Sequence, residues 1–359
     1  MIPVTKPFLP PVEEYEAFVK DIWTRHWLTN NGPLVNELEI RVKNYLQTPH
    51  FLFVNNGTIA LQMAIRALRL EGEVITTPFS FIATTSSLMW ERCTPVFVDI
   101  DPDTFNIDPE KIRAAITPKT TGILATHVFG NPCDIEAITE IAKEYNLKVI
   151  YDAAHSFGVK YKGQSLFNFG DISTTSFHAT KLFHTIEGGG VFTVNAELLK
   201  EMAYVRNFGF DGPENFATVG INGKNSEFHA AMGLANLKYI EDILNRRKDT
   251  YEYYLEHLQD KNIKFQKIEK NTTYNYSYFP AIFESEEILK KVENYCMMNL
   301  IVPRRYFHPS LNTIRILSGN KCPISEDIAS RVLCLPMYHV LSKEETNFIL
   351  RIILRALNY

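Results

Sequence analysis

Residues 148–155 read KVIYDAAH and residues 172–181 read ISTTSFHATK, and these two segments decide the fold. Each runs through apolar or β-branched residues that predict a buried strand, and each ends near one charged side chain. Asp152 follows the first predicted strand and Lys181 follows the second, and three consecutive glycines come after them at 188–190. The sequence therefore predicts a carboxylate and a lysine, 29 residues apart, that follow two strands of one sheet.

Short β-rich runs of this kind alternate with helical patterns over the first 195 residues. Near-continuous apolar strands separated by helices are typical of a mostly parallel α/β sheet that is covered on both faces. The pattern predicts one large sheet of seven strands. The predicted strands are 51–54, 74–76, 95–98, 122–126, 148–151, 174–177 and 191–194, and helices between them include 58–68, 80–90 and 135–145.

The rest of the chain predicts a second, smaller domain. Apolar positions at helical spacing indicate a long helical run over 226–258 that would bridge to it. Strands and helices then mix, which predicts a small C-terminal α+β domain. Because 359 residues are more than one core usually holds, we expect two domains, at 1–240 and 241–359.

Several polar residues lie at or just after predicted strand ends. They are Asp152, the turn at 55–57 and the segment 176–181. Ligands bind at the carboxyl ends of strands in such sheets, so we expect these residues to share one site. A lysine that forms an imine with an aldehyde, and a carboxylate that keeps a pyridine nitrogen protonated, are the minimal requirements of pyridoxal 5'-phosphate. Lys181 and Asp152 predict this cofactor.

An ordinary solvated surface lysine is the alternative for Lys181. The aromatic-rich strand end before it and the glycine turn after it favour burial. Burial lowers the pKa of an amine and frees it for imine formation.

The other predicted cofactor contacts each have a structural alternative. Gly57 and Thr58 open a helix, where free amides favour the cofactor phosphate and glycine permits close approach, but Thr58 could simply cap the helix. Ser176 offers a second hydroxyl to the phosphate, or bonds to the backbone. Phe81 would stack on the pyridine ring, or lie in the core. His155 would cover the opposite ring face, or bond to the backbone.

The most basic and aromatic stretch of the second domain is RRYFHP at 304–309. Arginine binds phosphate through two parallel hydrogen bonds, so this stretch could meet a pyrophosphate, and Arg305 is its candidate substrate contact. A solvated loop is the alternative.

Composition and charge exclude several classes of function. The net charge of −4 gives no basic surface for nucleic acid. Five cysteines without a CxxC pair favour a reduced, cytoplasmic protein without structural zinc, and no second ligand lies at metal spacing from His178, so no metal is expected. Residues 1–7 lack a signal-peptide pattern and no apolar run is long enough for a membrane span, so no membrane association is expected.

Six ordered segments resemble the DegT/StrS-type sugar-nucleotide aminotransferases. This family belongs to fold type I of the pyridoxal phosphate enzymes, the aspartate aminotransferase-like fold, and the resemblance runs nearly end to end. The segments are WLTNNGP at 27–33, NGTIAL at 56–61, DAAH at 152–155, SFHATK at 176–181, EGG at 187–189 and GIN at 220–222.

The resemblance implies a role for single residues. Lys181 matches the lysine that binds the cofactor, Asp152 the partner of its ring nitrogen and His155 the residue on the ring face. The remaining cofactor positions follow in the same way: Gly57, Thr58, Ile59 and Ser176 match phosphate-binding positions, and Phe81 matches the stacking aromatic.

Two further asparagines come from the matching segments. Asn31, in the first of them, is a candidate substrate contact. Asn222 matches an asparagine that relatives contribute to the phosphate site of the neighbouring subunit, which implies a homodimer with shared active sites. The chain departs from the family after this residue, because it reads NGKN at 222–225 where relatives often read NYRM, and His229 stands where glutamine is common.

Within the family, segments 76–80, 126–134 and 183–187 are most similar to enzymes that make dTDP-4-amino-4,6-dideoxy-D-glucose. This implies amination of dTDP-4-keto-6-deoxy-D-glucose, with L-glutamate as donor and 2-oxoglutarate as product, for the synthesis of O-antigen or other surface polysaccharide sugars. Amination of a different keto sugar nucleotide, at C3 or with an axial 4-amino product, is the alternative.

Other classes of function share parts of this pattern. Sugar dehydratases on the same scaffold carry histidine in place of the lysine, so Lys181 argues against them. A carbon–sulfur lyase of fold type I would need no nucleotide sugar. A non-catalytic regulator could keep the fold, but no helix-turn-helix or basic arm is present. A nicotinamide enzyme is disfavoured because no GxGxxG follows an early strand.

Overall fold

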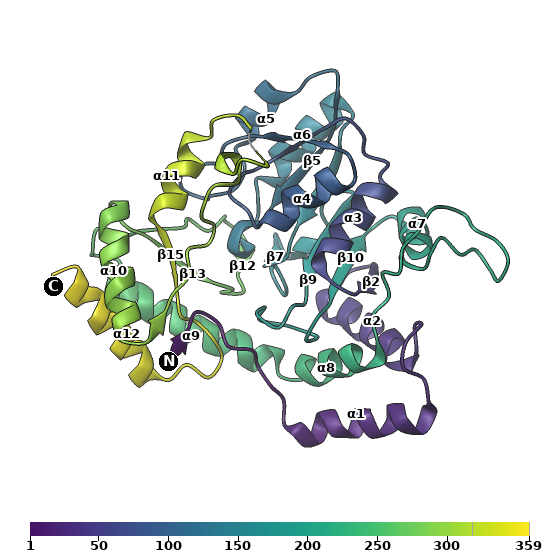
Figure 1. Cartoon of the computed structure of the whole chain (residues 1–359), viewed down its shortest axis with the longest axis horizontal. Coiled ribbons are helices and arrows are strands. Elements are labelled where there is room, and N and C mark those ends of the chain that lie inside the picture. Colours follow the sequence, from purple (N-terminus) through teal and green to yellow (C-terminus); the bar gives the residue numbers. More distant parts are fainter. Residues whose placement is uncertain (318, 359) are drawn as a thin grey trace.

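A seven-stranded sheet forms the centre of the molecule (Figure 1), which is a computed structural model that describes residues 1–317 and 319–358. The strand order is β2-β10-β9-β6-β5-β3-β4, and only β10 is antiparallel to its neighbours. The strands are β2 (His50–Val54), β3 (Glu73–Thr76), β4 (Thr94–Phe97), β5 (Thr120–Thr126), β6 (Lys148–Asp152), β9 (Ile172–Ser176) and β10 (Gly189–Thr193). The predicted mostly parallel sheet is confirmed, and each predicted strand overlaps one of these.

Helices cover both faces of this sheet. Neighbouring side chains of a strand point to opposite faces, and apolar side chains on each face pack against a helical layer. In β2, Leu52 and Val54 pack on the layer that contains α3 and α7, whereas Phe51 and Phe53 pack on the layer that contains α2 and α8. The helices of this part are α1 (Val12–Arg25), α2 (Pro33–Leu46), α3 (Gly57–Ala67), α4 (Ile82–Trp90), α5 (Pro109–Ala115), α6 (Ile135–Tyr145), α7 (Ala196–Arg206) and α8 (Glu227–Leu237).

A smaller α+β part lies beside the sheet (Figure 1), as predicted. Its antiparallel sheet has the order β11-β13-β15 and shares an apolar core with α9, α10 and α12. The elements are α9 (Ile240–Leu258), β11 (Lys264–Phe265), β13 (Phe279–Ile282), α10 (Glu286–Met298), β14 (Ile301–Val302), α11 (Pro323–Arg331), β15 (Val332–Leu335) and α12 (Lys343–Ala356).

Short strands tie distant segments to these two parts. Strand β1 (Ile2–Pro3) pairs with β14, so the first residues of the chain lie with the C-terminal elements. A second small sheet joins β12 (Thr272–Thr273) to the hairpin of β7 (Lys160–Tyr161) and β8 (Gln164–Ser165). The expected division into 1–240 and 241–359 stays a prediction.

The predicted helical run over 226–258 is two helices. Helix α8 ends at Leu237 and α9 begins at Ile240, and Tyr239 between them has φ −106° and ψ 4°, which is not helical. Helix α8 is buried on almost all sides over 230–236, whereas α9 buries one face, and apolar residues on both sides of the break hide it from helical spacing alone.

Two further facts bear on the setting of the molecule. Among the described residues, no helix combines the length and apolarity needed to cross a membrane. All five cysteines are buried, and none forms a disulfide.

Candidate active site

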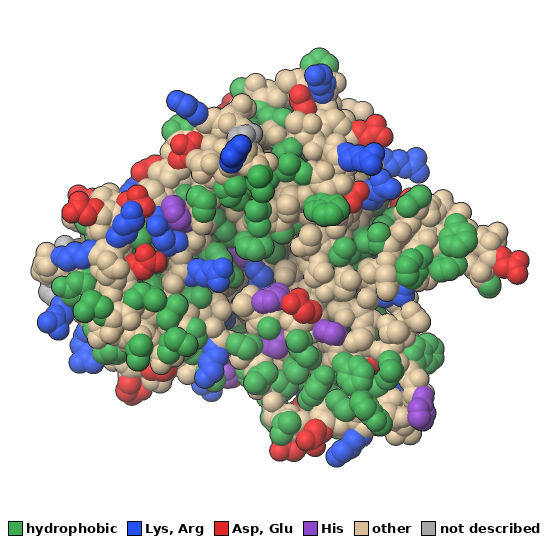
Figure 2. Space-filling view, viewed as in Figure 1, with side chains coloured by type: hydrophobic (Ala, Val, Ile, Leu, Met, Phe, Trp, Pro, Cys, Tyr) green, Lys and Arg blue, Asp and Glu red, His purple; other side chains and the backbone are tan. Residues whose placement is uncertain are grey.

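A cavity of about 320 Å³ lies where several strands of the central sheet end. Thr126 ends β5, Asp152 ends β6 and Ser176 ends β9, and all three line the cavity. Lys181 follows Ser176 by five residues and lines it too. In the space-filling view, histidine and charged side chains gather around a hollow near the middle of the face shown (Figure 2). The parallel topology thus brings the two halves of the predicted lysine–carboxylate pair to one place.

Asp152 is held rigidly at the floor of the cavity. Its Oδ2 accepts a 2.6 Å hydrogen bond from the Thr84 hydroxyl, and its Oδ1 accepts a 3.1 Å bond from the Ala154 amide. Burial raises the pKa of Asp152, and these two bonds together with the charge of Lys181 oppose the rise. A carboxylate in this setting gains most from a cation or a protonated ring nitrogen placed against it.

Lys181 lies on the loop that follows β9, where its amide donates a 2.8 Å hydrogen bond to the His178 carbonyl. Its ammonium lies 6.0 Å from the centre of the Tyr278 ring. Burial lowers the pKa of Lys181, although the charge of Asp152 and the Tyr306 hydroxyl act in the opposite direction. The amine is therefore shifted toward the neutral form that nucleophilic attack requires.

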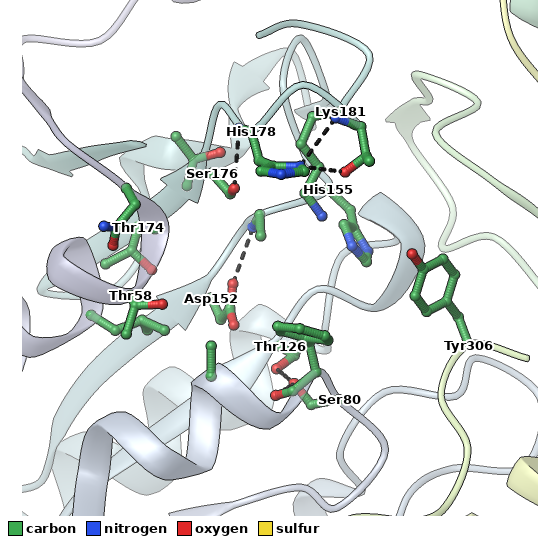
Figure 3. A pocket seen from close by; sticks show the side chains of 18 of the residues that line it. Thr58, Ser80, Thr126, Asp152, His155, Thr174, Ser176, His178, Lys181 and Tyr306 are labelled. Atoms are coloured by element: carbon green, nitrogen blue, oxygen red, sulfur yellow. Dashed lines mark hydrogen bonds between the residues drawn. The ribbon is translucent and has the colours of Figure 1, made fainter. Parts of the chain in front are cut away.

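His155 follows Asp152 by three residues in the sequence, and its side chain faces the same cavity (Figure 3). Its ring packs on Tyr278 at 4.7 Å between centres, and its side chain is 8% exposed. Burial lowers the pKa of His155 well below its ordinary value, so the ring is neutral at neutral pH. Its Nδ1 is buried and has no hydrogen-bond partner among the described residues. A buried polar atom without a partner indicates a place for a bound group.

The end of the cavity next to α3 is suited to an anion. Gly57 is the first residue of α3, where backbone amides point outward, and a Cβ built at Gly57 would lie 3.0 Å from the Cβ of Ser176. A side chain at this position would therefore crowd the end of β9. Asn56 caps the helix by accepting from the Ile59 amide at 2.8 Å, so the alternative role of Thr58 as the cap does not apply. Thr58 and Ser176 both line the cavity.

Phe81 is not a core residue, which was the alternative for it. It precedes α4, its side chain is 53% exposed and it lines the cavity. An exposed aromatic ring at a cavity wall is free to stack on a flat ligand.

Four predicted site residues do not line this cavity. Ile59 and Asn222 line a separate surface pocket, and the Ile59 amide is already bonded to Asn56. The Asn31 carbonyl accepts from the side chain of Asn36, away from the cavity. Arg305 lines a neighbouring groove of about 200 Å³, where its Nη2 donates to Glu286 and to the Ser330 carbonyl. The roles predicted for these four residues stay predictions.

Other residues line or support the cavity although none of them was predicted individually as a site residue. Tyr278, Arg304 and Tyr306 reach it from the C-terminal part, and Thr84 supports Asp152 from α4. The stretch at 304–309 was noted for its charge, but no sequence signal distinguishes Arg304 from Arg305. Thr84 and Tyr278 carry no local signal, because only tertiary contacts give them a place.

The cavity fits pyridoxal phosphate at each of its reactive groups. Figure 3 shows Asp152, His155 and Lys181 pointing into one space, with Thr58 and Ser176 at one end and Tyr306 at the other. The carboxylate suits the ring nitrogen, the amine suits the aldehyde, and the helix N-terminus with its neighbouring hydroxyls suits the phosphate. No group of three or more His, Cys, Asp or Glu side chains within the described ranges is placed to hold a metal ion. The fold and the cavity together define a fold type I pyridoxal phosphate enzyme.

Comparison with known proteins narrows this class. The sequence profile of the DegT/DnrJ/EryC1/StrS aminotransferase family matches residues 12–354, and the chain belongs to this family. Two similar curated proteins are the dTDP-4-amino-4,6-dideoxy-D-glucose transaminases of Shigella dysenteriae, 43% identical over 96% of both chains, and of Escherichia coli, 40% identical over 96% of this chain and 95% of the other. A similar solved structure is DesI in the presence of its TDP-sugar product, which is 32% identical. Its TM-score is 0.94, and the match covers 99% of this chain and 93% of DesI. Pyridoxal phosphate is the cofactor of this family, and so of this chain.

Proposed function

We propose that this chain transfers an amino group from L-glutamate to C4 of dTDP-4-keto-6-deoxy-D-glucose, which yields dTDP-4-amino-4,6-dideoxy-D-glucose and 2-oxoglutarate. The observation that carries this proposal is the meeting of Lys181 and Asp152 in one cavity. The sugar is taken from the names of the two curated transaminases, whose match extends over nearly the whole chain.

The chemistry divides between the cofactor and the protein. Pyridoxal phosphate, when bound, supplies an aldehyde that exchanges amino groups and a ring that accepts the electron pair of the reacting carbon. Asp152 keeps the proton on the ring nitrogen. Gly57, Thr58 and Ser176 hold the phosphate, while Phe81 and His155 fix the plane of the ring.

Lys181 moves the proton in both half-reactions. With L-glutamate bound beside the cofactor, the neutral amine of Lys181 would take the proton from the Cα of the donor and deliver it to the cofactor, which would keep the amino group for the second half-reaction. After 2-oxoglutarate leaves, the keto sugar enters and Lys181 moves a proton in the reverse sense to the sugar C4. Its lowered pKa favours the neutral amine that must accept the proton. Two half-reactions at one site give ping-pong kinetics.

A homodimer with shared active sites is part of the proposal. The segment between α7 and α8 leaves the body of the protein as a long arm (Figure 1). Apolar side chains on it are exposed: Phe208, Phe210, Phe216, Val219 and Ile221. Exposed apolar groups gathered on one projecting segment are typical of a protein interface. Asn222 lies at the base of this arm and outside the cavity of its own chain, which suits a contact with the site of a second copy.

The cytoplasm is the proposed location, because none of the five buried cysteines is paired, which is typical of a reducing compartment.

A product assay tests the proposed function. The wild-type protein is incubated with L-glutamate and one of three keto sugar nucleotides in separate reactions. They are dTDP-4-keto-6-deoxy-D-glucose, a GDP-linked 4-keto-6-deoxy sugar and a dTDP-linked 3-keto sugar. The position and configuration of the new amine are read by NMR. We expect an equatorial amine at C4 of the dTDP sugar.

The Lys181→Ala variant should lose turnover by on the order of 10³-fold or more, since no other group replaces its amine. Lys290→Ala, which removes an exposed lysine of α10, is the matched control and should keep full activity. If the protein aminates only a different keto sugar, the proposed substrate is wrong. Normal turnover by Lys181→Ala would show that Lys181 has no part in the mechanism.

A further inference from the structure

Arg304 reaches the cavity from the C-terminal part of the protein. Its backbone exchanges two hydrogen bonds with Cys334 at the end of β15, at 3.1 and 2.7 Å, which fixes the start of the 304–309 stretch. Its guanidinium lies 4.9 Å from the centre of the Tyr306 ring, and both side chains line the cavity. The main chain is thus anchored, and the exposed side chain borders both this cavity and the neighbouring groove that Arg305 lines.

The guanidinium of Arg304 is not committed to any protein group. It forms no ion pair and no hydrogen bond within residues 1–317 and 319–358, and its only described side-chain contact is the Tyr306 ring. The next residue shows the contrast, because Arg305 is bonded to Glu286 and to the Ser330 carbonyl. Five donors in a planar fork are therefore free at Arg304 to bind an anion.

The other charged side chains of the cavity are already engaged. Asp152 is bonded to Thr84 and Ala154, and Glu187 lies 3.5 Å from Nε2 of His178. Lys181 is occupied by the amine chemistry. Apart from Lys181, Arg304 is the one lysine or arginine that lines the cavity in the described part of the chain.

Arg304 and Lys181 act on the same part of the cavity. Arg304 lies 4.9 Å from the centre of the Tyr306 ring and Lys181 lies 6.0 Å from that of Tyr278, and these two rings are 5.5 Å apart. Burial raises the pKa of Tyr306, and the positive charges of Arg304 and Lys181 oppose this rise. Figure 3 places Tyr306 at the end opposite Thr58, so this cationic end is separate from the phosphate end.

We infer that Arg304 binds the carboxylate of the amino donor. This inference rests on the proposed function, since it assigns the donor subsite of that reaction. The carboxylate of an α-amino acid is one bond from the carbon on which Lys181 acts, so its receptor must lie close to Lys181. The diphosphate of a sugar nucleotide lies beyond the sugar ring from C4, and so needs a cation farther from Lys181. Arginine binds a carboxylate through two parallel hydrogen bonds, which also orients the Cα proton toward Lys181.

The two half-reactions, measured separately on the cofactor-loaded enzyme, test this inference. Single-turnover absorbance gives the apparent Kd for L-glutamate, and calorimetry with glutarate, which has carboxylates but no amine, gives binding without chemistry. Arg304→Gln should weaken both by roughly 10- to 100-fold, the effect of losing a charge-assisted pair, and Arg304→Lys should restore part of the loss. The sugar half-reaction of the same variants should change by less than about 3-fold.

Arg351→Gln is the matched control. Arg351 is exposed on α12 and also lies over an aromatic ring, at 5.9 Å from the centre of Phe348. This variant should keep wild-type constants in both half-reactions.

Three outcomes would overturn the assignment. They are an unchanged Kd for glutamate and glutarate in Arg304→Gln, an equal loss in both half-reactions, and a loss confined to the sugar half-reaction, which would place the diphosphate at Arg304. If the wild-type enzyme itself reacts with no amino acid, the proposed function fails and the inference fails with it. A reactive wild type with an unaffected variant rejects Arg304 alone.

Discussion

His127 shows how burial sets the protonation of a single residue beside the active site. Its Nδ1 accepts a 3.0 Å hydrogen bond from the Cys133 amide, and its ring stacks on Tyr151 with 4.4 Å between centres. Its own amide donates to the Asp152 carbonyl at 3.0 Å. Burial lowers the pKa of His127 to about 3, so the ring is neutral near pH 7 with its proton on Nε2. The neutral ring belongs to the packing that positions β6.

This residue should make the protein sensitive to acid. The pKa of His127 is lower in the folded state than the value of 6.5 expected in the unfolded chain, so only the unfolded chain takes up the proton between these values. Stability is therefore full above about pH 6.5 and is lost as the pH falls toward 3, by about 2 kcal/mol between pH 7.5 and 5.

Denaturant unfolding at several pH values measures this loss. Asparagine in His127→Asn keeps a hydrogen-bond acceptor but does not titrate. The variant should therefore take up about one proton fewer on unfolding between these pH values, which reduces the slope of the unfolding free energy against pH. His26→Asn, at an exposed position with a left-handed backbone, is the control and should leave it unchanged. Equal slopes for wild type and His127→Asn would contradict this explanation.

The sequence predicts the residues of the site whose signal is local. Asp152 and Ser176 end strands and Lys181 follows one, so their place at the carboxyl edge could be predicted from the strand pattern alone. Thr84 could not, because its contact with Asp152 joins positions 68 residues apart. The choice of Arg304 over Arg305 depends on which side chain faces the cavity, and a run of two arginines does not carry that information.

At the scale of elements, Glu227 joins α8 to the start of α2. Its carboxylate is fully buried, accepts from the amides of Leu34 at 3.0 Å and Val35 at 2.9 Å, and pairs with Arg25 at 3.2 Å. A negative charge at a helix N-terminus is stabilised by the free amides and the helix dipole. A Cβ at Gly32 would lie 2.6 Å from the Glu227 carboxyl carbon, so any side chain at this position would displace the carboxylate.

Neutralising this carboxylate should loosen the first turn of α2. Glu227→Gln is expected to lower the free energy of unfolding by about 1–3 kcal/mol, because the amide loses the charge that Arg25 and the helix amides stabilise. Hydrogen exchange should show faster exchange at Leu34 and Val35. Glu37→Gln removes an exposed pair with Arg41 on the same helix and should cost less than about 1 kcal/mol. An equal loss of unfolding free energy in the two variants would show that Glu227 does not stabilise the start of α2.

The presence of the strands and helices could be predicted better than the residues at which they end. The continuous apolar runs of β2 and β6, the apolar centre of β5 and the β-branched residues of β9 identify the sheet, because both faces of it are buried. The break at Tyr239 could not be predicted, since apolar residues at helical spacing occur on both sides of it. The link from Glu227 to α2 spans almost 200 positions, and only the folded chain reveals it.

At the scale of the whole molecule, the cavity is built from two parts of the chain. The sheet supplies Asp152 and Lys181, and the C-terminal part supplies Tyr278, Arg304 and Tyr306. The proposed amine chemistry therefore draws on the sheet, and the proposed recognition of the donor carboxylate draws on the C-terminal part. The overall architecture could be predicted from the order of strands and helices, whereas the wall that closes the cavity could not.

Mixing two inactive variants tests the proposed shared sites. Lys181→Ala lacks the reactive amine, and Asn222→Ala lacks the contact proposed for the neighbouring site. If sites are shared, a mixed dimer has one site with both residues intact, so an equal mixture after subunit exchange should recover roughly a quarter of wild-type activity. Light scattering should give about twice the 41.2 kDa chain mass. Activity no greater than the sum of the separate variants would place each site within one chain.

The central claim is that Lys181 and Asp152 hold pyridoxal phosphate for amino transfer between L-glutamate and a dTDP keto sugar. The most direct test is the absorbance spectrum of the purified protein, followed as each substrate is added. The predicted result is a visible cofactor band that is lost on adding L-glutamate and returns on adding dTDP-4-keto-6-deoxy-D-glucose. No cofactor band, even after pyridoxal phosphate is supplied, or a band that L-glutamate leaves unchanged, would contradict the claim.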